Sequence, residues 1–264
     1  MPRNELNTPT PTLPDWPVRT VRYPIKGTTV QLWAWSLATS SGEGTSIDAV
    51  ASNLSADERN RANRFHFDRD RQRFIAARAG LRALLGAATQ TAPEQVRFVY
   101  AEFGKPSLAG GAAGLRFNLS HTGDLALAAL TVGDEVGIDI EAHRPCAQAE
   151  AIARRHFTPD EATGCQRGAD EQRLQRFFDL WAAKESVIKL LGSGLRFPLT
   201  AFETPAAEAA TGEISLPADN PLRLQSCWLQ RVGGITGCSS ALATTDEPTE
   251  VLASRLDPAL LFGA

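Results

Sequence analysis

Hydrophobic and polar residues follow two different periods along the chain. Residues 28–37 read TTVQLWAWSL, where apolar side chains recur at every second position and predict a β-strand. Ser55 and Glu58 form a capping box, which predicts the start of an arginine-rich helical region. That region, with or without a break, extends to about Thr89 and buries a stripe of apolar residues.

The rest of the pattern predicts short strands, then helices, then closing strands. The expected strands cover 96–101, 115–119, 125–130, 135–141, 222–231 and 237–244, and the expected helices cover 147–156, a region opening at Thr158, and 174–191. The order strand, helix, strands thus occurs twice. It predicts an α+β protein built from two similar halves.

The ends of the chain differ from the middle. Residues 1–20 carry Pro9, Pro11, Pro14 and Pro17 between polar residues, so we expect a flexible, extended segment there. We place the N-terminal half at 21–134, the C-terminal half at 135–245 and a C-terminal tail at 246–264.

Composition and charge restrict the class of protein. With 43% hydrophobic and 22% charged residues the 264-residue chain resembles an ordinary soluble protein. No apolar run approaches the ~20 residues of a membrane span, and the N-terminus has no apolar signal core, so we expect a cytoplasmic protein. The net charge of −3 gives no general attraction to nucleic acid, and the four cysteines lack zinc-site or redox spacing.

The first segment with chemical character is VGIDIE at 136–141. Strand alternation places Asp139 and Glu141 on one face, with two isoleucines on the other. Paired carboxylates suit a hard divalent cation such as Mg²⁺. An exposed acidic strand face would have the same sequence.

The second segment is the helix at 177–189, FFDLWAAKESVIK. Trp181, Lys184 and Glu185 follow helical spacing, and Lys189 stands four residues after Glu185. A surface ion pair explains Glu185 and Lys189 equally well, but the flanking aromatic residues favour partial burial, where such charges need a ligand or metal.

Two further segments contain groups suited to an anion. In FNLSHTG, residues 117–123, a strand end is followed by Ser120 and His121, which we interpret as an anion-binding turn. In EFGKP, residues 102–106, glycine and Pro106 shape a turn that should present Lys105 outward.

Together the four segments resemble the surfactin-synthetase type of 4′-phosphopantetheinyl transferase. The family hallmarks occur here in the family order as Gly104-Lys-Pro106, Asn118-Leu-Ser-His-Thr122, Gly137-Ile-Asp-Ile-Glu141 and Trp181-Ala-Ala-Lys-Glu-Ser-Val-Ile-Lys189. The resemblance extends from about residue 28 to about residue 245. It implies transfer of the 4′-phosphopantetheine arm of coenzyme A to a serine of an apo acyl or peptidyl carrier protein, leaving 3′,5′-ADP.

The resemblance also implies a fold and roles for individual residues. The fold would be a monomeric pseudo-dimer with the active site at the seam between the halves. Asp139, Glu141 and Glu185 would bind Mg²⁺, Lys184 and Lys189 would attend the phosphates, and Glu185 could also accept the serine proton. The coenzyme A contacts would be Arg61, Arg73, Lys105, Pro106, Ser120, His121, Lys184 and Lys189. The sequence departs from the family at Glu58, where a lysine is expected near the 3′-phosphate.

Two other classes of function use the same residues. A metal-dependent nuclease or phosphoesterase could use the three carboxylates, with the arginines of residues 59–82 on nucleic acid, although the net negative charge disfavours this. A non-catalytic module that binds coenzyme A or a carrier would have no need of all three acidic residues. A purely structural protein explains the motifs least well.

Overall fold

The computed structural model of the protein describes residues 9–19, 28–38, 47–206 and 209–257. Its α-helices are α1 (Ile47–Ala51), α2 (Ala56–Ala62), α3 (Asp68–Thr89), α4 (Ala149–His156), α5 (Pro159–Cys165) and α6 (Asp170–Leu191). Its strands are β1 (Val18–Arg19), β2 (Thr29–Ser36), β3 (Phe98–Tyr100), β4 (Pro106–Leu108), β5 (Leu115–Thr122), β6 (Leu125–Val132), β7 (Val136–Ala142), β8 (Thr211–Ser215), β9 (Ser226–Arg231), β10 (Cys238–Thr244) and β11 (Glu250–Leu256). The predicted α+β class is confirmed.

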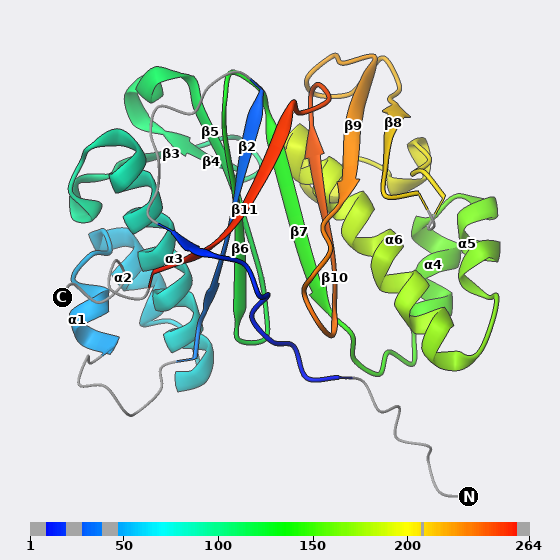
Figure 1. Cartoon of the computed structure of the whole chain (residues 1–264), viewed down its shortest axis with the longest axis horizontal. Coiled ribbons are helices and arrows are strands. Elements are labelled where there is room, and N and C mark those ends of the chain that lie inside the picture. Colours follow the sequence, from blue (N-terminus) through cyan, green and yellow to red (C-terminus); the bar gives the residue numbers. More distant parts are fainter. Residues whose placement is uncertain (1–8, 20–27, 39–46, 207–208, 258–264) are drawn as a thin grey trace, which may run out of the picture.

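The elements form four layers. One sheet has the order β1-β11-β2-β6-β5 and the other has the order β7-β10-β9-β8. Figure 1 shows the two sheets side by side, with α1 to α3 outside the first and α4 to α6 outside the second. The molecule therefore consists of two halves, each a sheet covered by helices, as predicted.

Three apolar clusters fill the spaces between these layers. One joins the first sheet to α3 and includes Trp35 and Leu84. A second lies between the two sheets and includes Leu127 and Ile138. A third joins the second sheet to α6 and includes Val187. Each large apolar side chain buried this way contributes about 1.5–3 kcal/mol, so the halves are held to each other as well as to their own helices.

Polar side chains of β5 join the halves at their seam. Asn118 Oδ1 accepts a hydrogen bond from the Ile138 N–H at 3.0 Å, and Thr122 Oγ1 accepts one from the Ala142 N–H at 3.0 Å. These side chains satisfy backbone donors on the edge of β7 that no strand pairs with in the described part of the chain. Ser120, between them on the same face of β5, is thereby directed at β7.

Helix α6 approaches β7 closely at one point. A Cβ atom at Gly137 would lie 2.0 Å from the carbonyl oxygen of Ser186. Only glycine fits there, because any side chain would collide with the helix backbone. The glycine of the VGIDIE segment thus sets the distance between the carboxylate strand and the helix that carries Glu185.

Several local expectations agree with the structure and one is wrong. The capping box at Ser55 is present, and the helical region breaks between α2 and α3. Residues 120–122, expected in a turn after a strand ending at 119, belong to β5, because the ladder with β6 continues to the pair Thr122–Leu125. The turn follows at Gly123, which has a positive φ of 53°.

The terminal segments contribute to the first sheet. Strand β11 lies within the expected tail 246–264, yet it pairs in parallel with β2 and covers an edge that would otherwise expose unpaired backbone groups. Strand β1, within the expected flexible segment 1–20, pairs with β11. Residues 1–8, 20 and 258–264 of these segments lie outside the described residues.

Among the described helices, none has both the length and the apolar character required to cross a bilayer.

Candidate active site at the seam

Asp139 lies at the centre of the seam between the halves. Its Oδ1 atom accepts hydrogen bonds from Lys189 Nζ at 2.6 Å and from Ser120 Oγ at 2.8 Å. Lys189 Nζ also donates to Ser120 Oγ at 2.9 Å. The strand β7, the helix α6 and the strand β5 each supply one of these three side chains, so the arrangement exists only when the halves are packed together.

The second oxygen of Asp139 has no partner. The side chain of Asp139 is buried, and Oδ2 makes no hydrogen bond with any described group. Leaving a buried polar atom unsatisfied costs about 1–3 kcal/mol, and more for a charged one. An uncompensated carboxylate oxygen in this position indicates a place for a ligand cation.

Two further carboxylates, Glu141 and Glu185, are repelled electrostatically by Asp139. Burial and repulsion from Asp139 raise the pKa of Glu185 to about 7, although Lys189 opposes the rise. Burial and the same neighbour raise the pKa of Glu141, against the opposing effect of Arg144, whose Nη1 lies 2.9 Å from Glu141 Oε2. Burial and the charge of Asp139 therefore both favour the protonated forms of Glu141 and Glu185.

His121 and Arg73 stand beside this cluster. Arg73 Nε donates to Asp124 Oδ1 at 2.8 Å, which holds the arginine of α3 against the turn after β5. The pKa of His121 is lowered by the surrounding protein and by positive Lys189 and Arg73, even though part of its side chain reaches solvent. The structure thus brings Arg73 and His121 of the N-terminal half near Lys189 of the C-terminal half.

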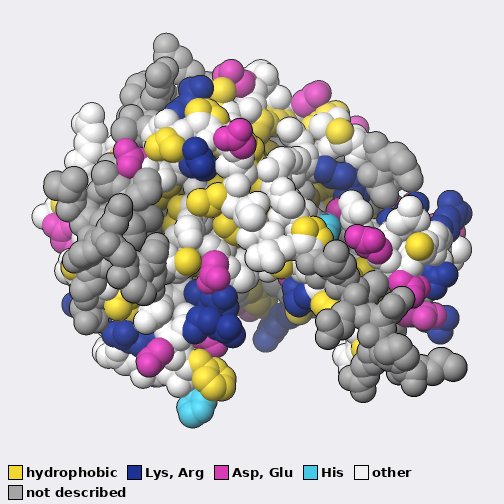
Figure 2. All heavy atoms as spheres, turned by 60° about the horizontal axis from the view of Figure 1, so that its bottom comes forward, with side chains coloured by type: hydrophobic (Ala, Val, Ile, Leu, Met, Phe, Trp, Pro, Cys, Tyr) yellow, Lys and Arg dark blue, Asp and Glu magenta, His cyan; other side chains and the backbone are white. Residues whose placement is uncertain are grey.

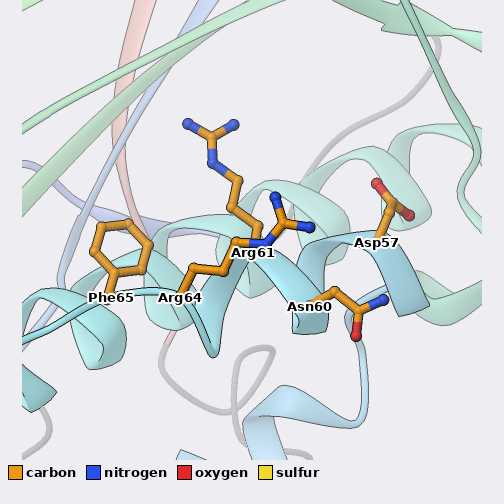
Figure 3. A pocket seen from close by; sticks show the side chains of 5 residues that line it. All are labelled: Asp57, Asn60, Arg61, Arg64 and Phe65. Atoms are coloured by element: carbon orange, nitrogen blue, oxygen red, sulfur yellow. The ribbon is translucent and has the colours of Figure 1, made fainter.

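A basic pocket is lined by residues of α2 and of the turn that follows it. It has a volume of about 580 Å³, and Figure 3 shows Arg61 and Arg64 extending from the same side of the helix with Phe65 beside them. Phe74 orders this group, because the Arg61 guanidinium lies 5.3 Å and the Phe65 ring 5.4 Å from its ring. In Figure 2 the surface is hollowed between the halves, and Lys and Arg side chains gather along the hollow.

Glu58 serves the interior of the N-terminal half. Its carboxylate is buried and bonded to Arg78 Nε and to Arg82 Nε, each at 2.6 Å. Arg82 is itself buried and donates to the backbone oxygens of Pro93 and Val96. Glu58 therefore ties α2 to α3 and has no free face for a phosphate, and Arg64, which the sequence analysis omitted, supplies a cation on the exposed side instead.

Lys184 is a correction to the expected site. Its side chain is fully buried, and its ammonium bonds Glu161 Oε2 and the carbonyl oxygens of Leu199 and Phe202, each at 2.7 Å. All three partners belong to the C-terminal half. The expectation that Lys184 contacts a phosphate is wrong, because Lys184 is five positions before Lys189 and therefore lies roughly 140° away from it around the helix.

Lys105 is a partial correction. We expected its ammonium to point outward, but it bonds Glu135 Oε2 and the Leu190 carbonyl oxygen, each at 2.8 Å, at the other end of β7. With Pro106 it lines a pocket of about 310 Å³ between the β3–β4 hairpin and the end of α6. Lys105 thus fastens the two halves together beside a cavity.

The donor set at Asp139 fits a hard divalent cation. As they stand, the described residues include no group of three His, Cys, Asp or Glu side chains that could hold a metal ion. Mg²⁺ needs no such cage, because it commonly takes one or two protein carboxylates and completes its shell with water and substrate phosphates. The unpartnered Asp139 Oδ2 and the raised pKa values of Glu141 and Glu185 meet that requirement.

Comparisons with known proteins agree over most of the chain. Residues 135–244 match the family described as the 4′-phosphopantetheinyl transferase superfamily, and residues 41–132 match the N-terminal part of a 4′-phosphopantetheinyl transferase. The 4′-phosphopantetheinyl transferase HetI of a Nostoc species is 39% identical over 182 residues, 68% of this chain and 72% of HetI. Sfp of Bacillus subtilis is 30% identical over 164 residues, 62% of this chain and 71% of Sfp.

Proposed function

The chain belongs to the 4′-phosphopantetheinyl transferase superfamily, and on that premise we propose that the cleft at its seam transfers phosphopantetheine from coenzyme A to a carrier-protein serine. The observation that carries the proposal is the buried Asp139, whose Oδ2 atom has no partner among the described groups. A non-catalytic binding module would not need a buried carboxylate oxygen that is left without a partner.

Asp139, Glu141 and Glu185 are proposed to hold Mg²⁺ there. The ion would bind the pyrophosphate of coenzyme A and neutralise charge on its oxygens. Asp139 supplies the oxygen that has no other partner, and Glu141 and Glu185 lose their mutual repulsion when a cation stands between them. Asp and Glu carboxylates of this kind select hard cations over soft ones.

Lys189 and Ser120 act on the reacting phosphate. Lys189 Nζ is within hydrogen-bond distance of Asp139 and Ser120 and is partly exposed, so a phosphate oxygen can reach it from the cleft. Its charge stabilises the negative charge that grows on the phosphate oxygens during transfer. Glu185 is also proposed to accept the proton of the incoming serine, directly or through a water molecule.

The remaining basic residues bind the nucleotide end of coenzyme A. Four basic side chains of the N-terminal half are proposed to hold the 3′-phosphate. They are Arg61 and Arg64, which line the pocket on α2, and Arg73 and His121. Lys105 and Pro106 line the 310 Å³ pocket that we assign to the adenine side. Because Glu58 is occupied by Arg78 and Arg82, the 3′-phosphate is bound without the lysine found at that position in the family.

The partners follow from the reaction. The nucleophile belongs to an apo acyl or peptidyl carrier protein, and the enzyme is proposed to act as a cytoplasmic monomer, since its two halves already form the complete cleft. A net charge of −3 supports neither nucleic acid nor anionic membrane as a partner.

The test is a mass measurement. The protein is incubated with Mg²⁺, coenzyme A and an apo carrier protein, and the carrier is weighed intact. A gain of one phosphopantetheine arm is expected, and the gain should vanish with a chelator or in Asp139→Ala.

The contrary result is equally clear. If several apo carriers gain no mass while the protein cleaves DNA in a metal-dependent reaction, the transferase proposal is overturned in favour of a nuclease. If carriers are modified at the same rate by Asp139→Ala, the carboxylate cluster is not the active site.

A further inference from the structure

Three polar side chains outside the carboxylate cluster form a continuous hydrogen-bonded chain. His143 Nε2 lies 2.8 Å from Ser239 Oγ, and Ser239 Oγ donates to Asp179 Oδ1 at 2.6 Å. His143 follows the end of β7, Ser239 is on β10 and Asp179 is on α6. The chain thus joins the two strands and the helix that surround the cleft on the C-terminal half.

The direction of the hydrogen bonds is fixed by the donors available. A serine hydroxyl has one proton, and here the Asp179 carboxylate, which can only accept, takes it. Ser239 must therefore accept from His143, so the Nε2 atom of His143 carries a proton. Ser239 is buried, and each of its hydrogen-bonding roles is satisfied.

Ser239 is the residue of β10 that lies directly opposite Glu141 in the ladder. Directly opposed residues project from the same face of a sheet, so Ser239 and Glu141 both face α6. His143 is two residues beyond Glu141, and its N–H donates to the Gly237 carbonyl oxygen at 2.8 Å. The hydrogen-bonded chain is consequently attached to the strand end that carries Glu141.

A second set of contacts holds the same strand end. The ring of Phe178 is stacked against His143 at 5.9 Å and lies 5.2 Å from the guanidinium carbon of Arg144. Arg144 in turn bonds Glu141. Two successive residues of α6, Phe178 and Asp179, therefore fix the backbone from Glu141 to Arg144.

These contacts attach α6 to the sheet on both sides of Glu185. At one end Lys189 bonds Asp139, and at the other Asp179 bonds Ser239. The two attachments are ten residues apart, or about 15 Å along the helix, with Glu185 between them. Rotation or sliding of α6 would break one of them before it moved Glu185 away from β7.

We propose that Asp179, Ser239 and His143 are positioning residues that hold Glu141 and Glu185 in the relative position from which both bind one divalent cation. The inference rests on the proposed function, because it assumes that these carboxylates bind the metal. None of the three touches the reacting atoms. Outer partners of this kind typically change metal affinity by about 10–100-fold when they are removed.

Ser239 has a matched control on the same strand. Ser240, the next residue, is also buried, and its Oγ donates to the Val232 carbonyl oxygen at 2.8 Å. Strand alternation directs Ser240 to the opposite face, away from α6. Ser239→Ala and Ser240→Ala each remove one buried hydroxyl, which makes two side-chain hydrogen bonds at Ser239 and one at Ser240, and only the first variant breaks the chain to α6.

The experiment measures metal binding directly. Mn²⁺, which prefers the same oxygen ligands as Mg²⁺, is titrated into the full-length protein and free ion is followed by electron paramagnetic resonance. We expect Ser239→Ala to bind Mn²⁺ about tenfold more weakly than the unaltered protein. Ser240→Ala should bind as the unaltered protein does, and Ser239→Thr, which keeps the hydroxyl, should recover most of the affinity.

Unaltered Mn²⁺ affinity in Ser239→Ala would overturn the proposal, and so would an equal loss in Ser240→Ala or an unaltered protein that binds no Mn²⁺. If Ser239→Ala does not fold, His143→Ala replaces it at a less buried position, and the same weakening is expected.

The binding experiment involves no turnover, so it separates this inference from the proposed function. Mn²⁺ binding that depends on Ser239, combined with no modification of any carrier, would support the positioning role and refute the transferase reaction. Carrier modification with Mn²⁺ affinity independent of Ser239 would do the reverse.

Discussion

Helix α6 carries two lysines, each paired with a buried carboxylate, and the two pairs differ in what surrounds them. Lys184 lies 2.7 Å from Glu161, and Lys189 lies 2.6 Å from Asp139. The Lys184 side chain is completely inaccessible, whereas 28% of the Lys189 side chain is exposed. The bond lengths do not distinguish the two pairs, but their neighbours do.

Both charged groups of the Lys184–Glu161 pair have their hydrogen-bond partners within the protein. Its ammonium has two carbonyl partners besides the carboxylate, and Glu161 also accepts from the backbone N–H groups of Thr158 and Thr204. No oxygen of Glu161 is left buried without a partner among the described atoms. Such a pair holds α5, α6 and the loop at 199–204 together and needs nothing from outside.

The Lys189–Asp139 pair, by contrast, lacks some of its hydrogen-bond partners. Asp139 keeps one buried oxygen without a partner, and Glu141 and Glu185 add negative charge that one lysine does not balance. A protein gains no stability from that arrangement, because buried charges that lack partners are costly. The contrast shows that an ion pair alone indicates nothing about function, whereas missing positive charge around it indicates a ligand site.

Asp139→Asn is expected to give the largest effect. Loss of the charge that binds the metal should lower the rate of carrier modification on the order of a thousandfold, as when a group stabilising transition-state charge is removed. The melting temperature should stay level or rise, because the unpartnered carboxylate oxygen and its repulsion of Glu141 and Glu185 disappear. A large loss of melting temperature would show instead that Asp139 is structural.

Lys184→Met should have the next largest effect, and it should act on stability. Removing one partner leaves Glu161 buried without its counter-charge, which costs about 3–5 kcal/mol of unfolding free energy. Denaturant unfolding measures this loss. Below the unfolding transition, the affinity for coenzyme A should be unchanged, and a selective loss of that affinity would restore Lys184 to the binding site.

Lys189→Met is the matched change on the same helix, and it should reduce activity more than stability. Carrier modification should fall about a hundredfold, because one charge near the phosphates is lost. The unfolding free energy should fall by less than in Lys184→Met, since 28% of the Lys189 side chain is exposed whereas that of Lys184 is inaccessible. Equal destabilisation by the two lysine variants would remove the distinction between the pairs.

The pH dependence of stability should give the smallest effect. The pKa of Glu185 is raised from 4.5 to about 7, so the folded state holds this proton more tightly than the unfolded chain does. Its stabilising contribution is complete below pH 4.5 and is lost as the pH rises through 7. Without metal, the melting temperature of the unaltered protein should therefore fall relative to that of Glu185→Gln across this range.

Added Mg²⁺ should reduce that difference, because a cation removes the repulsion that raises the pKa. The comparison with Glu185→Gln isolates this residue from His121 and His143, whose lowered pKa values give slopes of the opposite sign. Parallel melting curves for the two proteins without metal would show that Glu185 is not in an uncompensated cluster.

Much of the molecule was predictable from local sequence. The four motifs identified the family, and hydrophobic periodicity located β2, the helical region of α2 and α3, and α6. Strand alternation correctly put Asp139 on the opposite face from Ile138, which lies between the sheets while Asp139 bonds Lys189 of α6, because that inference needs only a strand of period two. The strand β11 was missed because its pairing with β2 joins residues more than 200 positions apart.

The errors at the site have the same cause. Lys184 and Lys189 look alike in the motif, although helix geometry alone separates them around the axis. From the sequence, Glu58 indicated only a missing phosphate-binding lysine, because its ion pairs with Arg78 and Arg82 depend on the packing of α2 against α3. The hydrogen bonds of Ser239 have no local signal, because its partners Asp179 and His143 are 60 and 96 residues away.

The sequence by itself determined which chemical groups this protein has and the elements on which they stand, because capping, periodicity and motif spacing act over a few residues. Tertiary structure alone decided which charges are satisfied. Glu161 lies 23 residues before Lys184, and Ser120 lies 19 before Asp139. Whether a buried carboxylate finds its full set of partners depends on the packing of the two halves, and that packing made Lys184 part of the core and left Asp139 with an unpaired oxygen in the cleft.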